Sequence, residues 1–181
     1  RRVTWHELLD WTDALAASLY DAGLVPGQRL SLWTSNRVES VVGLLAAARN
    51  GYVCNPSLHL NYTGEEIVAL LQRIRAGAVI AEEGYGAASP AVLDAIAALP
   101  AMKRAFRLPK GRASGTGFPK PGQGSPPPAD DNPDRVCYLA FTSGTTGTPK
   151  GVLHSHNTLL ANARDLVKDW GHGTGTVLLS L

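Results

Sequence analysis

The residues best suited to chemistry lie in one short stretch that combines hydroxyls, glycines and a lysine directly after an apolar run. They are Thr142, Ser143, Gly144, Thr145, Thr146, Gly147, Thr148, Pro149, Lys150 and Gly151. Glycines let backbone amides approach an anion closely, and successive amides can form an anion-binding nest. Hydroxyls donate hydrogen bonds to phosphate oxygens, and a flexible lysine adds a compact positive charge. The stretch therefore predicts a site that holds a polyphosphate.

Two better-known motifs do not fit this stretch. A Walker A loop needs Gly-Lys-Ser/Thr, whereas here Pro149 precedes Lys150 and Gly151 follows it. A nucleophile elbow needs glycine two residues before its serine, and Phe141 occupies that place before Ser143. The stretch is therefore neither a standard nucleotide loop nor a hydrolase nucleophile.

Segments with helical spacing alternate along the chain with short apolar runs that are typical of strands. Helices are expected over about 4–22, 36–50, 63–76, 89–99 and 159–170. Strands are expected over 29–33, 52–56, 78–81, 135–141, 152–153 and 176–181. This alternation predicts an α/β fold with a mainly parallel sheet flanked by helices.

Cap residues set the expected ends of the first three helices. A Ser, Thr or Asn followed three residues later by Glu is the signature of a helix start, and glycine commonly follows a helix end. The expected starts are Thr4 with Glu7, Asn36 with Glu39, and Thr63 with Glu66. The expected ends are Gly23, Gly51 and Gly77.

Proline and glycine divide the chain in two. Residues 109–133 contain seven Pro and five Gly, and such a composition cannot form a helix interior or a central strand. We therefore expect an α/β subdomain over 1–108, a linker or surface loop over 109–133, and a phosphate-loop segment over 134–181. A solvated linker is favoured over a functional lid.

Composition excludes several classes of protein. The chain has 181 residues, of which 44% are hydrophobic and 18% charged, with a net charge of +2, as in soluble globular proteins. It has no long basic run, which argues against a nucleic-acid partner, and no apolar stretch long enough for a membrane span. Cys54 and Cys137 suggest no disulfide framework, so we expect a reducing compartment, the cytoplasm.

At Tyr138–Gly151 the sequence resembles the phosphate-loop signature of the adenylate-forming (AMP-binding) superfamily. That superfamily includes acyl-CoA synthetases, peptide-synthetase adenylation domains and firefly-type luciferases. The following Val152–Asn157 and the upstream Gly23–Leu30 also resemble it, and within it the chain is most similar to acyl-CoA synthetases. Asn50–His59 resembles ligases for alicyclic or medium-chain acids such as cyclohexanecarboxylate.

The resemblance implies an ATP-dependent carboxylic acid–CoA ligase, with Mg²⁺ as cofactor and ATP, coenzyme A and a small carboxylic acid as its partners. It implies that the chain is part of the large N-terminal domain. The phosphate-binding residues would be Thr142, Ser143, Gly144, Thr145, Thr146, Gly147, Thr148, Pro149 and Lys150. Lys150 would neutralise charge during catalysis, Pro149 would restrain the loop exit, and His156 is a candidate for a place near the site. No metal ligand is identifiable, and the oligomeric state is left open.

The resemblance also implies missing parts. The family's acyl-binding segments, its Mg²⁺-binding glutamate and its C-terminal domain with the adenylation lysine would follow Leu181. We therefore expect an N-terminal fragment that is inactive by itself. Two alternatives stay open: a non-catalytic nucleotide- or anion-binding module that retains only the phosphate loop, and a stand-alone structural or interaction domain.

Overall fold

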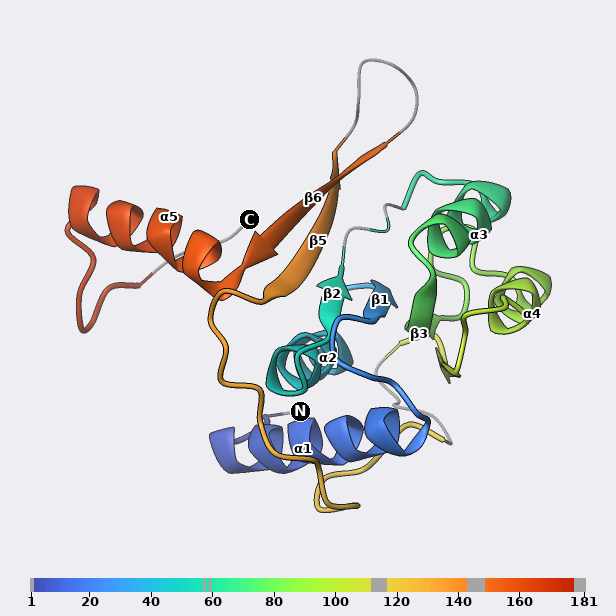
Figure 1. The fold of residues 1–181 in the computed structure, drawn as a ribbon, viewed down its shortest axis with the longest axis horizontal. Helices are drawn as coiled ribbons and strands as arrows, with labels where there is room; N and C mark the ends of the chain where they lie inside the picture. Colours follow the sequence, from blue (N-terminus) through green and yellow to red (C-terminus); the bar gives the residue numbers. More distant parts are fainter. Residues whose placement is uncertain (1, 57, 59, 112–116, 143–148, 178–181) are drawn as a thin grey trace.

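Five helices and six strands form the described part of the chain (Figure 1). The computed structural model describes residues 2–56, 58, 60–111, 117–142 and 149–177. The helices are α1 (Trp5–Asp21), α2 (Val38–Arg49), α3 (Gly64–Arg73), α4 (Pro90–Ala97) and α5 (His156–Asp169). The strands are β1 (Arg29–Trp33), β2 (Val53–Asn55), β3 (Ala76–Glu82), β4 (Arg104–Leu108), β5 (Val136–Thr142) and β6 (Lys150–Ser155).

The strands form one sheet in the order β4-β3-β1-β2-β5-β6. All neighbouring pairs are parallel except β5 and β6, which run antiparallel. The fold class predicted from the sequence, a mainly parallel sheet with flanking helices, is therefore confirmed.

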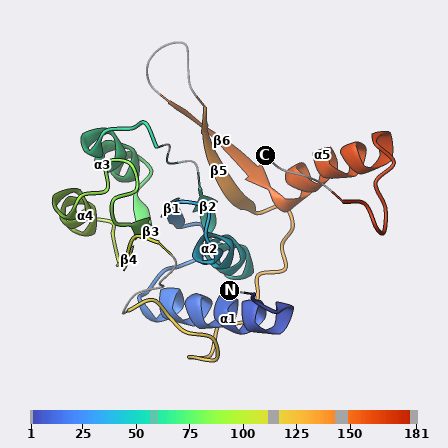
Figure 2. The same ribbon diagram turned by 180° about the vertical axis from the view of Figure 1, so that it is seen from behind.

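The sheet carries a hydrophobic core on each face. Successive strand residues point to opposite faces, so Leu30 and Leu32 join a core with α1 and α2, while Trp33 joins a core with α3 and α4. Seen from behind, α3 and α4 lie together, whereas α5 stands apart on the other side of the molecule (Figure 2). The two cores lie in the part of the fold that precedes β6 and α5.

Local caps start and end the helices largely as the sequence predicts. Thr4 and Glu7 form a complete capping box at α1, and Thr63 and Glu66 form another at α3. Gly23 follows α1 with a φ of 82°, a left-handed conformation that glycine adopts without steric cost.

Two of the expected boundaries are wrong. Asn36 does not cap α2: Arg37 is the N-cap residue and makes no side-chain cap bond, because the carboxylate of Glu39 is occupied by the Arg37 guanidinium. Gly77 does not end α3 but lies within β3. The helix ends at Arg73, and Arg75 takes the left-handed turn with a φ of 50°.

Three further elements differ from expectation. Strand β4 is not predicted from the sequence, because its buried Phe106 and Leu108 alternate with exposed arginines. β6 spans six residues rather than Val152–Leu153 alone. Helix α5 forms, but none of its residues is buried. Most of the expected strand over 176–181 lies outside the described residues.

The described part of 109–133 contains no helix or strand, yet it is held to the helices at defined points. Phe118 is buried in the core beside α1 and α2. The Trp11 indole Nε1 donates a hydrogen bond of 2.6 Å to the Pro119 carbonyl. Further along, the Asp130 backbone N–H donates to the carbonyl of Arg49 at 2.8 Å. The segment thus runs across α1 and the end of α2.

Candidate functional site

The polar stretch singled out in the sequence connects the two antiparallel strands β5 and β6. Their register places Thr142 opposite Lys150, and the Thr142 hydroxyl donates a hydrogen bond of 3.4 Å to the Lys150 carbonyl. Pro149 and Lys150 are described and lie at this end of the hairpin. The predicted phosphate-binding residues 143–148 lie outside the described residues.

Strand β5 anchors the hairpin in the body of the protein. Its side chains alternate, so that Cys137, Leu139 and Phe141 are buried, and it pairs with β2 through Tyr138 and Cys54. Strand β6 lies at the edge of the sheet and is largely exposed. One strand of the hairpin is therefore fixed by packing, while the other presents the exposed Lys150.

The two cysteines are buried in neighbouring strands, Cys54 in β2 and Cys137 in β5, and form no disulfide. Burial raises the pKa of the Cys54 thiol to about 12, and it also raises the pKa of Cys137. Because the thiolate is the reactive form, neither residue is poised as a nucleophile. Their role in the described structure is packing within the sheet.

The structure adds one residue that the sequence did not suggest, Arg73 in the last turn of α3. Its Nη1 atom donates a hydrogen bond of 3.0 Å to the Pro149 carbonyl, 76 residues away in the chain. The guanidinium of Arg29 in turn holds the α3–β3 connection, donating to the carbonyls of Ile74 and, at 3.2 Å, of Arg75. No spacing rule links α3 to the loop exit, so only the fold could find this contact.

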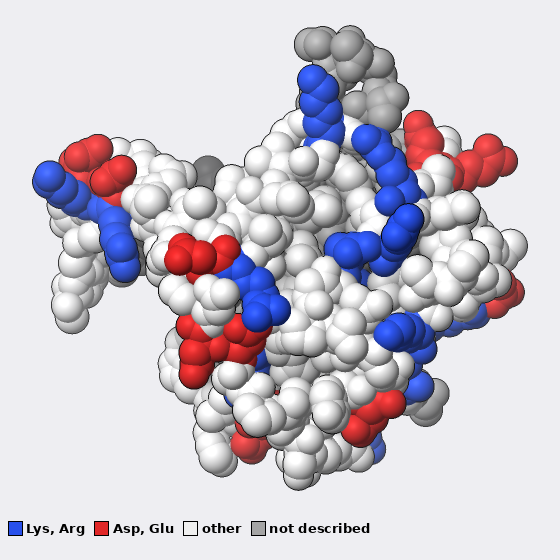
Figure 3. Space-filling view, viewed as in Figure 1, with Lys and Arg blue, Asp and Glu red and all other residues white. Residues whose placement is uncertain are grey.

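Positive charge gathers on this face of the molecule. Figure 3 shows Lys and Arg side chains from the upper end of the β5–β6 hairpin across to the side of α3, with Asp and Glu side chains beside them at the upper right. Lys150 and Arg73 are both exposed there. Such a surface favours a polyanion over a neutral ligand.

His154 in β6 and His156 in α5 lie away from the Lys150 end of the hairpin. His156 is the first residue of α5, six residues after Lys150 and at the opposite end of β6, which is about 20 Å at the rise of a strand. The ring of His154 contacts the Tyr138 ring, with the centroids 6.3 Å apart. The structure therefore brings Thr142, Pro149 and Lys150 together and leaves His156 apart from them.

A second group of charged residues lies buried where β1 and β3 end. The Arg37 guanidinium contacts Glu39 at 2.9 Å and Glu82 at 3.4 Å, and all three side chains are at most 6% exposed. Ser35 donates to Glu82 from its backbone N–H at 2.9 Å and from its hydroxyl at 2.5 Å. Burial alone would raise the pKa of Glu82, but the bonds from Ser35 and Gly111 and the Arg37 charge lower it. Both carboxylates contact the one Arg37 guanidinium, so removing a member of this group would leave a buried charge without its partner.

Neither a metal centre nor a membrane helix occurs in the described part of the chain. Among residues 2–56, 58, 60–111, 117–142 and 149–177, no three His, Cys, Asp or Glu side chains group closely enough to hold a metal ion. No helix there is long and apolar enough to cross a bilayer.

Comparison with known families decides what kind of protein carries this hairpin. The family model described as AMP-binding enzyme matches residues 1–181, the whole chain. The chain belongs to the AMP-binding enzyme family. The resemblance expected from Tyr138–Gly151 is thereby confirmed.

Relatives within the AMP-binding family include acyl-CoA ligases. The chain is 36% identical over 169 residues to the 3-[(3aS,4S,7aS)-7a-methyl-1,5-dioxo-octahydro-1H-inden-4-yl]propanoyl:CoA ligase of Mycobacterium tuberculosis, covering 89% of this chain and 33% of the ligase. Apo MatB from Rhodopseudomonas palustris superimposes with a TM-score of 0.76 at 28% identity, over 94% of this chain and 33% of MatB. ATP-bound MatB gives a TM-score of 0.73 at 29% identity over the same shares. The chain thus spans about a third of the length of these relatives.

Proposed function

We propose that the full-length protein is an AMP-forming carboxylic acid–CoA ligase and that this chain supplies its ATP phosphate-binding hairpin. The observation that carries the proposal is the β5–β6 hairpin, which joins the sequence Thr142–Gly151 to a core-anchored strand. Membership of the AMP-binding family and the likeness to acyl-CoA ligases support it.

The proposed reaction has two half-reactions. The carboxylate oxygen of the acid attacks the α-phosphorus of ATP, which forms the acyl-adenylate and releases pyrophosphate. The sulfur of coenzyme A then attacks the acyl carbonyl, which forms the thioester and releases AMP. The first half-reaction concentrates negative charge on the leaving pyrophosphate, where positioned donors and cations lower the barrier.

In the proposal, the residues of the hairpin bind the phosphates of ATP and stabilise the leaving pyrophosphate in different ways. Lys150 neutralises charge on the leaving pyrophosphate, and Thr142, Ser143, Thr145 and Thr146 donate hydrogen bonds from their hydroxyls. Gly144 and Gly147 let the backbone approach the phosphates closely. His156 has no assigned role, because it lies at the other end of β6.

Arg73 is a positioning residue in this scheme. It holds the Pro149 carbonyl and thereby fixes the residue directly before Lys150. Helix α3 can act as the fixed point, because Ile67, Leu70 and Leu71 bury it in the core of the sheet. A loop exit that is held by a packed helix keeps Lys150 in position for the charge that develops on the leaving pyrophosphate.

The cofactor and substrate class follow from the same reading. Mg²⁺ would accompany ATP, but the described residues offer no ligand cluster, so we assign it no ligand and no step here.

The name of the Mycobacterium tuberculosis relative describes a fused alicyclic ring on a propanoyl chain, which supports an alicyclic acid as substrate. Two buried, unpaired cysteines support a cytoplasmic location.

A pyrophosphate-exchange assay on the full-length protein tests the proposal. With ATP and Mg²⁺, we expect exchange that depends on the acid and is strongest for alicyclic acids, compared with linear medium-chain and aromatic ones. Binding of ATP without exchange for any acid would contradict the proposal and favour a non-catalytic nucleotide-binding module.

A further inference from the structure

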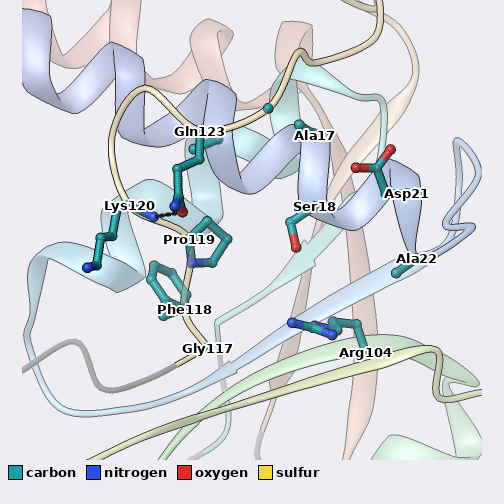
Figure 4. A pocket seen from close by; sticks show the side chains of 12 residues that line it. Ala17, Ser18, Asp21, Ala22, Arg104, Gly117, Phe118, Pro119, Lys120 and Gln123 are labelled. Carbon is teal, nitrogen blue, oxygen red and sulfur yellow. Dashed lines mark hydrogen bonds between the residues drawn. The ribbon is translucent and has the colours of Figure 1, made fainter.

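A hollow of about 730 Å³ lies between α1, β4 and residues 117–124, within the size range of small-molecule sites (Figure 4). Its lining includes Ala17, Ser18, Asp21, Arg104, Phe118 and Lys120. In the sheet, β3, β1 and β2 separate β4 from β5. At the usual strand spacing this places β4 about 19 Å from β5, so the hollow is distinct from the β5–β6 hairpin.

The wall formed by residues 117–124 is fixed to the rest of the protein. The Phe118 ring packs edge-to-face on Trp11 and on Phe106, with centroids 6.1 Å and 5.2 Å apart. A Cβ at Gly124, whose φ is 72°, would lie 2.8 Å from the Cβ of Ala17, so the segment lies directly on α1. With the Trp11–Pro119 hydrogen bond, these contacts make the hollow a built feature rather than a gap beside a loose chain.

Two polar groups converge on the hollow. Figure 4 shows the Arg104 guanidinium extending beneath Ser18, whose hydroxyl points toward it. The Arg104 guanidinium carbon lies 4.9 Å from the centroid of the Phe106 ring, a cation–π contact that orients it. Among the described residues Arg104 forms no ion pair. Asp21 and Lys120 lie at the rim with their charged ends directed away from Arg104.

We propose that this hollow binds an organic monoanion with a flat apolar body and one carboxylate. The carboxylate would take the guanidinium of Arg104 in a bidentate pair and a hydrogen bond from Ser18. The apolar body would lie against Ala22 and Pro119, the half-buried apolar residues of the lining. Arg104 and Lys120 set against Asp21 leave a net charge of +1 at the hollow, which matches a ligand with a single negative charge better than a polyphosphate.

Isothermal titration of the chain with 2-naphthoate tests the site. We expect 2-naphthoate to bind about tenfold more tightly than neutral 2-naphthamide, because the amide cannot form the charge-assisted pair. R104Q should weaken 2-naphthoate binding about tenfold, and S18L should abolish it by placing an apolar side chain where the carboxylate would lie. R107Q is the matched control: Arg107 lies on the same strand but pairs with Asp94 at 2.6 Å, so binding should be unchanged.

Several outcomes would overturn the proposal that this hollow binds a carboxylate. Equal affinity for the acid and the amide, unchanged binding by R104Q, or no binding of 2-naphthoate at roughly 1 mM would each do so. Displacement of 2-naphthoate by ATP would assign the probe to the hairpin instead. Circular dichroism melts of S18L show whether its fold is intact, and R104Q, at an exposed position, keeps the test decisive if S18L does not fold.

Discussion

The region from α1 to β4 and the region formed by β6 and α5 differ sharply in how they are stabilised. The first packs on two cores that cover both faces of the sheet, with side chains such as Leu71 and Ile80 fully buried. The second has no buried residue in α5, where Leu160 is 46% exposed, and Trp170, directly after the helix, is 67% exposed. Strand β5 joins the two regions, since it pairs with β2 and leads into the stretch predicted to bind phosphate. Stability and chemistry are thus assigned to different elements of one sheet, which is testable by substitution.

The largest expected contrast is between two leucines. L71A removes a fully buried side chain from the core and should lower the free energy of unfolding by about 3 kcal/mol. L160A changes a half-exposed side chain of α5 and should stay within about 0.5 kcal/mol of the parent chain. Urea unfolding of both variants measures this contrast, and equal losses would break the distinction between the two regions.

The buried charged group of the first region should make stability depend on pH. The pKa of Glu82 is lowered from its ordinary value of 4.5, so its contribution is present above pH 4.5 and lost as the pH falls through the lowered pKa. E82Q should cost about 2 kcal/mol at pH 7, because the buried Arg37 loses a charged partner. It should also flatten the acid limb of the stability curve. E83Q, at the exposed neighbouring residue, is the control, and an unchanged acid limb in E82Q would contradict the assignment.

The smallest expected effect concerns the link between the two regions. R73A removes the hydrogen bond to Pro149 and should lower kcat/KM for ATP in the first half-reaction about fivefold, with an unchanged melting temperature. R73K should restore part of the loss, and K168A on the exposed part of α5 should have no effect. A melting temperature that falls together with kcat/KM would mean that Arg73 only stabilises the fold.

Sequence reasoning succeeded where the determinants are local. The Thr4–Glu7 and Thr63–Glu66 capping boxes, and the apolar runs of β1 and β5, depend on residues close together in the chain. The predicted phosphate-binding stretch is also local in sequence, but residues 143–148 lie outside the described residues, so its role stays a prediction.

It failed where distant segments decide. The cap expected at Asn36 is lost because Arg37, which binds Glu39, is also held by Glu82 on the distant strand β3. The contact between Arg73 and Pro149 joins segments 76 residues apart. No periodicity or spacing encodes such pairs, because they depend on which elements the fold brings together.

The central claim is that Lys150 at the end of the hairpin acts on the leaving pyrophosphate. Single-turnover kinetics of K150A in the full-length protein, for each half-reaction separately, tests this most directly, with K168A as control. Loss of one such charge should slow adenylation about a hundredfold, near 3 kcal/mol of barrier. The thioester half-reaction, started from synthetic acyl-adenylate, carries no pyrophosphate charge and should be slowed much less. Unchanged adenylation, or an equal loss in both halves, would contradict the claim.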